Sequence, residues 1–275
     1  MEKTEMMATI DKAEFRGKVV LISGAAQGIG AAVARAMYLG GAGLALLDRQ
    51  SDKLQLLLDE FAAAAPDGSV RPLALTADVS LSNEVNAAVG RVERELGAID
   101  ILINVAGILR MGEVTTISDE DWEQSMAVNT GGVFRLSRAV AQRMLPRRCG
   151  VIVTVGSNAA ATPRMGMAAY AASKAASMQF TRCLALELAP YGIRCNSVSP
   201  GSTDTEMQRQ LWSAPDDAGA VIRGRLDQYR LGIPLGRIAS ADDIAQSICF
   251  LASDRARHIT MHDLRVDGGA TLDAR

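Results

Sequence analysis

The chain has 275 residues, of which 48% are hydrophobic and 22% are charged, and its formal net charge at pH 7 is −2. This composition is typical of a globular protein with a packed core and excludes a long disordered chain. The sequence has no long basic stretch and no apolar run that could span a bilayer. We therefore expect neither a nucleic-acid partner nor a membrane.

Residues 1–16 form a polar extension without the apolar segment of a secretion signal, which predicts a cytoplasmic protein. The four cysteines are widely spaced, a pattern that favours reduced thiols over disulfides or a zinc site. His258 and His262 have the spacing of metal ligands on a helix, but no carboxylate accompanies them in an H-E-x-x-H pattern. We expect no metal.

Short apolar runs alternate with segments of helical periodicity from near the N-terminus to the end, and each run is short enough to be a buried strand. The predicted strands are residues 19–23, 43–47, 70–75, 99–104, 151–155, 193–198 and 264–266. The predicted helices are residues 28–39, 52–65, 82–96, 131–145, 168–189 and 241–253. Ser82, Ser118 and Ser240 have the character of helix N-caps.

This alternation predicts an α/β protein with a Rossmann-type, doubly wound fold, in which helices cover both faces of a seven-stranded parallel sheet. No linker rich in Pro, Gly or Ser divides the chain, so we expect a single domain over residues 1–275. The connection of residues 202–231 is longer and more polar than the others. Such insertions often close over a site, and we expect a substrate loop or lid there.

A glycine-rich turn joins the first predicted strand to the first helix, with Gly24, Gly28 and Gly30 spaced G-x3-G-x-G and with Gln27 and Ile29 beside them. Residues without a Cβ let the backbone approach a pyrophosphate, and a helix N-terminus offers it unpaired N–H groups. Glycines gather in any tight turn, so the motif gains its weight from its position between strand and helix. We predict a dinucleotide site here.

Asp48 ends the second predicted strand, near the place where an acidic side chain meets the adenosine ribose in dinucleotide-binding folds. A carboxylate there accepts hydrogen bonds from the ribose hydroxyls and repels a 2′-phosphate, which favours NAD over NADP. Arg49 weakens this inference, because a guanidinium could pair with a phosphate or stack on adenine. The alternative role for Asp48 is an N-cap of the next helix.

Small and polar residues end the next two strands: Asp78 and Val79 follow the third, and Asn104, Ala106 and Gly107 end the fourth. The carboxyl ends of strands line the ligand crevice in such sheets. We expect Asp78 to accept a hydrogen bond from the adenine amino group, and the two small residues to let the adenosine lie against the backbone. Simple turn chemistry is the alternative for all of them.

Tyr170 and Lys174 lie four residues apart, and so one turn apart on the same face of a predicted helix. An ammonium held beside a phenol favours the phenolate and can make it a base near neutral pH. Ser157 follows the predicted strand 151–155 and is expected to face the start of that helix. Without this serine, Tyr170 and Lys174 could be a chance pair on the solvated face of a helix.

Together these residues resemble the short-chain dehydrogenase/reductase family over essentially the whole chain. The matching positions, catalytic or cofactor-binding in that family, are Gly24, Gly28, Gly30, Asn104 to Gly107, Asn129, Ser157, Tyr170, Lys174, Pro200, Gly201, Thr203 and Thr205. Val105 stands where the family more often has a second asparagine. The resemblance implies hydride transfer to NAD, with Tyr170 as the base and Ser157 holding the substrate oxygen. Lys174 would lower the pKa of the tyrosine and bind the nicotinamide ribose, while Asn129 would anchor a water.

A closer resemblance lies in the segments expected to shape the substrate pocket, residues 107–112, 161–167, 199–209 and 231–236. These resemble family members that oxidise 2,3-dihydro-2,3-dihydroxybenzoate with NAD. The resemblance implies an anionic cyclic diol as the substrate and 2,3-dihydroxybenzoate, a precursor of catechol siderophores, as the product. In the family, the faces of the helices predicted at 131–145 and 168–189 build oligomers, which implies a homotetramer or a homodimer.

The carboxylate of such a substrate needs a cation, and Arg110 and Arg164 lie on loops expected to border the crevice. Met111, Met165, Met167 and Met207 lie on the same loops and would form an adaptable apolar wall for a flat ring. The alternatives are rim contacts for the arginines and the filling of core gaps for the methionines.

Two other functions stay open on the sequence alone. One is a family member that acts on another cyclic alcohol or on a 3-oxoacyl substrate, since a fold does not determine a substrate. The other is a non-catalytic sensor or interaction protein that binds NAD(H). Intact Ser157, Tyr170 and Lys174 count against this second alternative.

Overall fold

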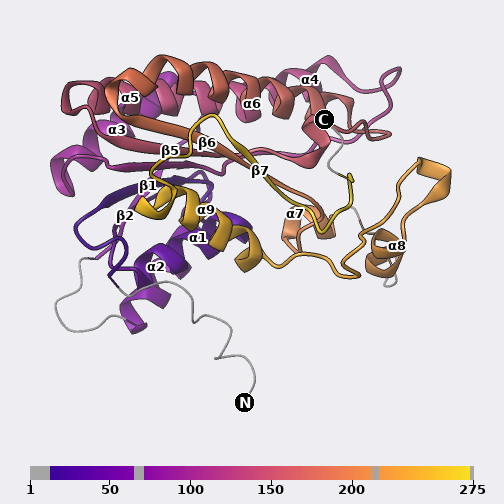
Figure 1. Cartoon of the computed structure of the whole chain (residues 1–275), viewed down its shortest axis with the longest axis horizontal. Helices are drawn as coiled ribbons and strands as arrows, with labels where there is room; N and C mark the ends of the chain where they lie inside the picture. The colour runs from indigo at the N-terminus through magenta and orange to yellow at the C-terminus, as the bar shows by residue number, and fades with distance from the viewer. Residues whose placement is uncertain (1–12, 65–70, 211, 213–216, 273–275) are drawn as a thin grey trace.

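The computed structural model describes residues 13–64, 71–210, 212 and 217–272. Its centre is a seven-stranded parallel sheet with the strand order β3-β2-β1-β4-β5-β6-β7 (Figure 1). The strands are β1 (Val19–Ser23), β2 (Gly43–Asp48), β3 (Leu73–Thr76), β4 (Ile101–Asn104), β5 (Gly150–Val155), β6 (Ile193–Pro200) and β7 (Asp263–Val266). The order runs outward in both directions from β1 and β4, as it does in a doubly wound fold.

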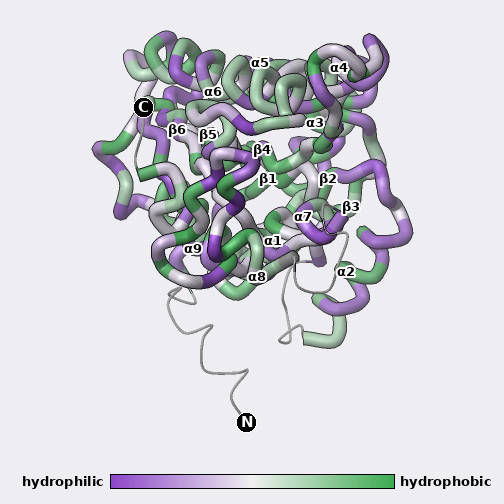
Figure 2. Tube along the Cα trace, turned by 90° about the vertical axis from the view of Figure 1, so that its right-hand side faces the viewer, coloured by the Kyte–Doolittle hydropathy of each residue, from purple (hydrophilic) through white to green (hydrophobic). Residues whose placement is uncertain are grey.

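Helices cover both faces of the sheet. In Figures 1 and 2, α1, α2 and α9 lie on one face, and α3, α5 and α6 lie on the other. The α-helices are α1 (Gly28–Leu39), α2 (Ser51–Ala64), α3 (Ser82–Glu95), α4 (Asp119–Ser125), α5 (Val133–Arg147), α6 (Ala168–Leu188), α7 (Glu206–Arg209), α8 (Asp217–Arg223) and α9 (Ala241–Ala252). The π-helix η1 (Met126–Gly132) leads from α4 into α5. Within the described residues, no helix has the length and apolar character needed to cross a bilayer.

The hydrophobic core is divided by the sheet, because alternate side chains of a strand point to opposite faces. On β1, Val20 and Ile22 pack in the cluster that includes α1 and α9, whereas Leu21 packs in the cluster that includes α3 and α5. All three side chains are fully buried. Burial on both faces explains why the predicted strands are continuously apolar instead of alternating with polar residues.

The predicted fold class is confirmed, and each of the seven predicted strands is present. Boundaries differ by a few residues: β6 continues to Pro200, and β3 begins at Leu73, while residue 70 lies outside the described residues. The helix predicted at 131–145 begins inside the π-helix and becomes α-helical at Val133. Helix α4 is absent from the sequence prediction.

The predicted N-cap at Ser82 is wrong. Ser82 is the first residue of α3, and Leu81 occupies the cap position without a side-chain hydrogen bond. The chain is turned before it reaches Ser82, because the Asp78 carboxylate accepts a hydrogen bond from the Ser80 amide at 2.7 Å. Ser118 does cap α4, where its hydroxyl oxygen accepts a hydrogen bond from an amide of the first turn.

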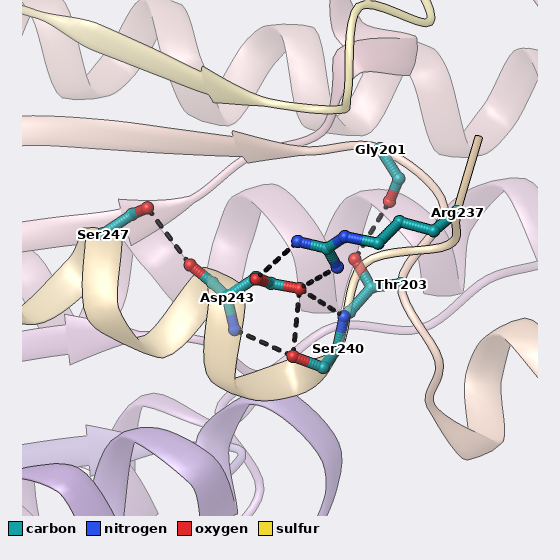
Figure 3. A network of polar contacts seen from close by, with 6 residues as sticks. All are labelled: Gly201, Thr203, Arg237, Ser240, Asp243 and Ser247. Atoms are coloured by element: carbon teal, nitrogen blue, oxygen red, sulfur yellow. Dashed lines mark hydrogen bonds and ion pairs between the residues drawn. The ribbon is translucent and has the colours of Figure 1, made fainter. Parts of the chain in front are cut away.

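Ser240 caps α9 as predicted, within a network that holds both ends of the connection between β6 and α9 (Figure 3). Its hydroxyl accepts from the Asp243 amide, and the Asp243 carboxylate accepts from the Ser240 amide and from Arg237. Beside this network, Thr203 donates to the carbonyl oxygen of Gly201 at 3.1 Å and pairs with the segment before α9 through a β-bridge. The start of the connection is thereby anchored to the start of α9.

The predicted insertion of residues 202–231 is partly helical between these anchors. It contains α7, α8 and the 3-10 turn η4 (Leu226–Gln228). Residues 211 and 213–216 lie outside the described residues. That the insertion closes as a lid stays a prediction.

Candidate active site

A cavity of about 480 Å³ opens at the carboxyl ends of the strands. It lies at the point between β1 and β4 where the strand order reverses, which is where open α/β sheets bind ligands. Most of the predicted site residues line it: Gly24, Gln27, Gly28, Ile29, Asp48, Arg49, Asp78, Val79, Ala106, Gly107, Arg110, Ser157, Arg164, Tyr170, Lys174, Pro200, Gly201, Thr203, Thr205 and Met207. The predicted site residues outside the lining are Gly30, Asn104, Met111, Asn129 and Met165.

The glycine-rich turn brings the N-terminus of α1 to this cavity. Gly24 has a φ of +67°, and a Cβ there would lie 2.6 Å from the amide nitrogen of Ala106, so the turn packs directly on the end of β4. Gly30 does not line the cavity, but a Cβ there would lie 2.0 Å from the carbonyl oxygen of Gly24. The packing of the turn therefore explains why this residue is glycine. The cap residue Gln27 makes no side-chain hydrogen bond to the helix, and the first turn has no acidic residue. The amides at this helix start are therefore available to an anion such as a pyrophosphate.

Asp48 holds a carboxylate at the edge of the cavity, at the end of β2. Its Oδ2 accepts a hydrogen bond from the Ala26 amide at 3.1 Å, and its Oδ1 accepts one from the Gln50 amide at 3.0 Å. The first bond ties the carboxylate to the glycine-rich turn, and neither donor belongs to α2, which begins at Ser51. These two donors therefore do not support the alternative role of Asp48 as an N-cap of α2. Each oxygen keeps acceptor capacity for a further donor, such as a ribose hydroxyl.

Asn104 joins neighbouring elements of the fold, and that it contacts a cofactor stays a prediction. It is buried, and its Nδ2 donates to the Ser137 hydroxyl at 3.0 Å and to the Thr154 hydroxyl at 3.4 Å. These bonds join β4 to α5 and β5. Asp78 and Val79 do line the cavity, and Asp78 also makes the turn contact expected as its alternative role.

The structure brings Ser157 and Tyr170 together at one end of the cavity. Ser157 follows β5, and its hydroxyl oxygen accepts a hydrogen bond from the Ala159 amide at 3.1 Å. Tyr170 lies in the first turn of α6 and is 9% exposed. Burial raises the pKa of the Tyr170 phenol above its ordinary value, and a hydrogen bond with Ser157 partly opposes this rise. Two hydroxyls therefore point at a common place where a substrate oxygen can bind.

Lys174 lies one turn further along α6 and is 4% exposed. Its Nζ donates to the carbonyl oxygen of Val155 at 2.8 Å and lies 5.9 Å from the centre of the Tyr170 ring. Burial lowers the pKa of Lys174 to about 8. That the ammonium lowers the pKa of the tyrosine stays a prediction, since burial is the main cause of both shifts in the protein without ligands.

Asn129 lies in the π-helix, and both polar atoms of its side chain form hydrogen bonds. Its Oδ1 accepts from the Ile108 amide at 2.8 Å, while its Nδ2 donates to the Ile108 carbonyl and to the Ser173 hydroxyl, both at 2.9 Å. Asn129 is fully buried. It therefore holds the loop after β4 against α6. The predicted role in anchoring a water stays a prediction; the Oδ1 atom, which accepts one hydrogen bond, keeps capacity for a second.

The two predicted carboxylate-binding arginines differ in their surroundings. The Nε of Arg110 forms an ion pair with Asp121 at 3.2 Å, and its Nη2 donates to Gln124 at 3.0 Å, so this guanidinium is already engaged. Arg164 is half-buried, and burial lowers the pKa of its guanidinium, with Asp267 acting in the opposite direction. Arg164 is therefore the stronger candidate for a substrate anion.

The predicted methionines also differ in whether they line the cavity. Met167 and Met207 line the cavity. Met111 and Met165 do not, and they are 48% and 60% exposed. The predicted apolar wall is therefore smaller than expected, because the loops carrying Met111 and Met165 turn these side chains toward solvent.

Arg230 is a charged residue of the cavity lining that was not predicted from the sequence. It lines the same end of the cavity as Arg164 and is half-buried. Burial, the guanidinium of Arg164 and that of Arg225 lower the pKa of Arg230, in that order of importance. The sequence offers no signal for it, because it lies in the long connection among other arginines and matches no motif.

The described residues contain no group of three His, Cys, Asp or Glu side chains that could hold a metal ion. The groups that the site presents are its hydroxyls, its lysine and its arginines, and the glycine-rich turn and Asp48 fit a dinucleotide.

A family model described as enoyl-(acyl carrier protein) reductase matches residues 24–271. The chain is 52% identical to 2,3-dihydro-2,3-dihydroxybenzoate dehydrogenase of Bacillus subtilis (strain 168), over 94% of this chain and 97% of that protein. It is 46% identical to the protein of the same name from Escherichia coli (strain K12), over 95% of this chain and 100% of that protein. A crystal structure of a short-chain type dehydrogenase/reductase from Mycobacterium marinum matches with a TM-score of 0.85 and 33% identity, covering 95% of this chain and 98% of that one.

The doubly wound sheet, the helix start suited to a pyrophosphate and the buried Ser, Tyr and Lys set define an oxidoreductase that uses a nicotinamide dinucleotide. The similarities then show its family. The chain belongs to the short-chain dehydrogenase/reductase family, and the resemblance inferred from the sequence is confirmed.

Proposed function

We propose that the protein oxidises 2,3-dihydro-2,3-dihydroxybenzoate to 2,3-dihydroxybenzoate, a precursor of catechol siderophores, with NAD as the acceptor. The observation that carries the proposal is the half-buried guanidinium of Arg164 in the same cavity as the Ser157 and Tyr170 hydroxyls. A cation beside a base suits a substrate with both a carboxylate and a ring hydroxyl. The names of the two relatives above, at 52% and 46% identity, support the same substrate.

In this reaction Ser157 and Tyr170 bind the substrate hydroxyl that is oxidised, and Tyr170 takes its proton as a general base. The glycine-rich turn and Asp48 would hold the dinucleotide, which would supply the hydride acceptor, and the ring ketone formed in this way would tautomerise to the aromatic 2,3-dihydroxybenzoate. Because burial raises the pKa of Tyr170, the phenol needs positive charge nearby to release its proton. Lys174, whose Nζ lies 5.9 Å from the ring centre, supplies that charge from this chain.

The preference for NAD rests on Asp48. Its carboxylate is held by two backbone amides at the cavity edge, where it would accept hydrogen bonds from the ribose hydroxyls and repel a 2′-phosphate. Arg49 is exposed and lines the same region, and its guanidinium could pair with a 2′-phosphate. We therefore expect the protein to prefer NAD without excluding NADP.

We also propose a homotetramer or homodimer that acts in the cytoplasm. Helices α5 and α6 lie side by side on the outer face of one helical layer (Figure 1) and expose large apolar side chains there, including Phe134 and Leu186. Such side chains suit burial against a second copy. Cys149 and Cys183 are free and exposed, which suits a reducing compartment.

The test is an assay of the purified protein with NAD and 2,3-dihydro-2,3-dihydroxybenzoate, following NADH by absorbance and 2,3-dihydroxybenzoate by chromatography. We expect both products in equal amounts. Activity on a neutral cyclic alcohol or a 3-oxoacyl substrate, with none on this diol, would assign another substrate. Binding of NADH without turnover of any of these compounds would favour a sensor.

A further inference from the structure

Two arginines from distant segments meet at the substrate end of the cavity. Arg164 comes from the loop between β5 and α6, and Arg230 comes from the connection between β6 and α9. Both also line a second, small cavity of about 20 Å³, together with Asn158 and Ser202. Because Arg164 and Arg230 line both cavities, their side chains lie at the wall that the two cavities share.

Neither side chain is ion-paired with another residue in the part of the chain that the structure describes. Among the residues that the structure describes, neither Arg164 nor Arg230 forms a side-chain hydrogen bond or an ion pair. Other arginines near the cavity do: Arg110 pairs with Asp121, and Arg225 pairs with Asp227 at 3.0 Å. Half-buried charges are costly unless they are paired, so an unpaired pair of cations indicates a site for an anion that comes from outside the chain.

Asp267, whose charge acts on Arg164, already accepts hydrogen bonds from other donors. Its Oδ2 accepts from the Thr271 hydroxyl at 2.7 Å and from the Asn158 amide at 3.2 Å, and its Oδ1 accepts from the Gly269 amide at 3.0 Å. It therefore attracts Arg164 from a distance without neutralising it. The two arginines together carry an uncompensated charge at the cavity wall.

The backbone holds Arg230 in this place. Arg230 and Arg225 exchange two backbone hydrogen bonds of 2.9 Å, which close the hairpin of residues 224–232 beside α8 (Figure 1). Gly224 and Gly232 form its base with φ values of +88° and +90°. A Cβ on Gly224 would lie 2.5 Å from the carbonyl oxygen of Arg230, so the close approach requires glycine. The fixed hairpin therefore positions the Arg230 side chain.

We propose that Arg164 and Arg230 together bind the carboxylate of the substrate and thereby select a ring that carries this group. The guanidinium fork matches a carboxylate geometrically, and two forks can engage both of its oxygens. Anchored there, the ring presents its hydroxyl to Ser157 and Tyr170 in the same cavity. This inference rests on the proposed function, and it assigns Arg230, in place of Arg110, as the partner of Arg164.

The test compares Arg164→Met and Arg230→Met with Arg225→Met, which removes an exposed, ion-paired cation from the same hairpin. For each, kcat/KM is measured with 2,3-dihydro-2,3-dihydroxybenzoate and with 5,6-dihydroxycyclohexa-1,3-diene, the same ring without the carboxylate. We expect Arg164→Met and Arg230→Met to lower the ratio of the two values about 10- to 100-fold, mainly through KM. Arg225→Met should leave the ratio unchanged. An unchanged ratio in Arg230→Met would overturn the proposal, as would an equal fall in Arg225→Met.

A binding measurement separates this inference from the proposed function. Calorimetry with the NADH complex measures the affinity for 2,3-dihydroxybenzoate and for catechol, which lacks the carboxylate. If the wild-type protein does not oxidise the diol, the proposed function fails; a 10- to 100-fold weaker binding of the benzoate to Arg230→Met still supports the pair as an anion site. Equal affinity in wild type and variant overturns it. Arg230→Lys, which keeps the charge without the fork, should give an intermediate loss, and it provides a second variant if Arg230→Met does not fold.

Discussion

The Nζ of Lys174 lies 5.9 Å from the centre of the Tyr170 ring, and its hydrogen bond goes to the carbonyl oxygen of Val155. Both side chains are buried. Burial raises the pKa of the phenol and lowers that of the ammonium, so each group is shifted toward its neutral form. The pair is therefore poised for proton transfer once further positive charge and a substrate oxygen enter the cavity, and it is not a preformed phenolate.

The first prediction concerns the base itself. Tyr170→Phe removes one hydroxyl and should lower kcat by about 10²- to 10⁴-fold, because proton removal from the substrate loses its acceptor. The affinity for NADH, measured by fluorescence, should be unchanged, since the ring remains. Tyr191→Phe, a change at a tyrosine that is 39% exposed, serves as the control and should keep full activity. Turnover near the wild-type rate in Tyr170→Phe would assign the base elsewhere.

Lys174→Met should stabilise the protein at neutral pH while removing activity. The folded pKa is about 8, against 10.5 for the free side chain. Below pH 8 both states hold the proton, and the buried ammonium lowers the free energy of unfolding by about 3 kcal/mol. The hydrogen bond to Val155 returns about 1 kcal/mol of this, so the variant should gain about 2 kcal/mol at pH 7.

The sign of the pH dependence follows from the same shift. Between pH 8 and 10.5 the unfolded chain keeps the Lys174 proton that the folded protein has lost, so the contribution of Lys174 to the free energy of unfolding should rise with pH in this window. The buried thiols of Cys195 and Cys249, whose pKa is raised from 9.0 to about 12, act in the opposite direction above pH 9, but they do so equally in wild type and variant. Lys174→Met should lack this rise. Urea unfolding at pH 7, 9 and 10.5 measures both curves, and parallel curves for wild type and variant would contradict the lowered pKa.

The fold was predictable because its signals are local. Each strand is a short run buried on both faces, as Val20, Leu21 and Ile22 show, and such runs are visible without knowledge of their neighbours. The meeting of Ser157 with Tyr170 also follows from the chain, since one residue closely follows a strand and the other lies in the first turn of the next α-helix. Geometry of this kind depends only on the order of elements.

What the sequence could not predict depends on contacts between distant segments. Arg230 reaches the cavity through a hairpin whose base is two facing glycines, and no motif marks it. Asn104 matches a cofactor motif, and the motif does not reveal that its Nδ2 donates to Ser137 and Thr154 on other elements. The direction of the Tyr170 pKa shift depends on burial, which the four-residue spacing to its lysine does not encode.

Asp48→Ser should reduce the preference for NAD. The shorter hydroxyl loses the charge that repels a 2′-phosphate, so we expect the ratio of kcat/KM for NAD to that for NADP to fall by about tenfold or more. Adding Arg49→Met should lower activity with NADP again if that guanidinium pairs with the phosphate. A ratio that stays constant in Asp48→Ser would remove this carboxylate from the ribose site. Because Asp48 also accepts from Ala26 and Gln50, the melting temperature of each variant must be measured alongside.

Two helical glycines should respond in opposite ways to alanine. By helix propensity alone, Gly30→Ala in α1 and Gly90→Ala in α3 would each stabilise the protein by about 1 kcal/mol. A Cβ on Gly90 meets only the flexible end of Arg94 at 3.4 Å, so that gain should be realised. A Cβ on Gly30 would lie 2.0 Å from the carbonyl oxygen of Gly24, and the glycine-rich turn must move to admit it.

We therefore expect Gly90→Ala to raise the free energy of unfolding and Gly30→Ala to lower it by about 1–3 kcal/mol. Gly30→Ala should also weaken NADH binding, because the displaced turn carries the amides at the start of α1. Urea unfolding and NADH fluorescence measure the two effects on the same samples. If Gly30→Ala lost stability but bound NADH as the wild type does, the close approach at Gly24 would serve packing alone, and the dinucleotide would not depend on the geometry of this turn.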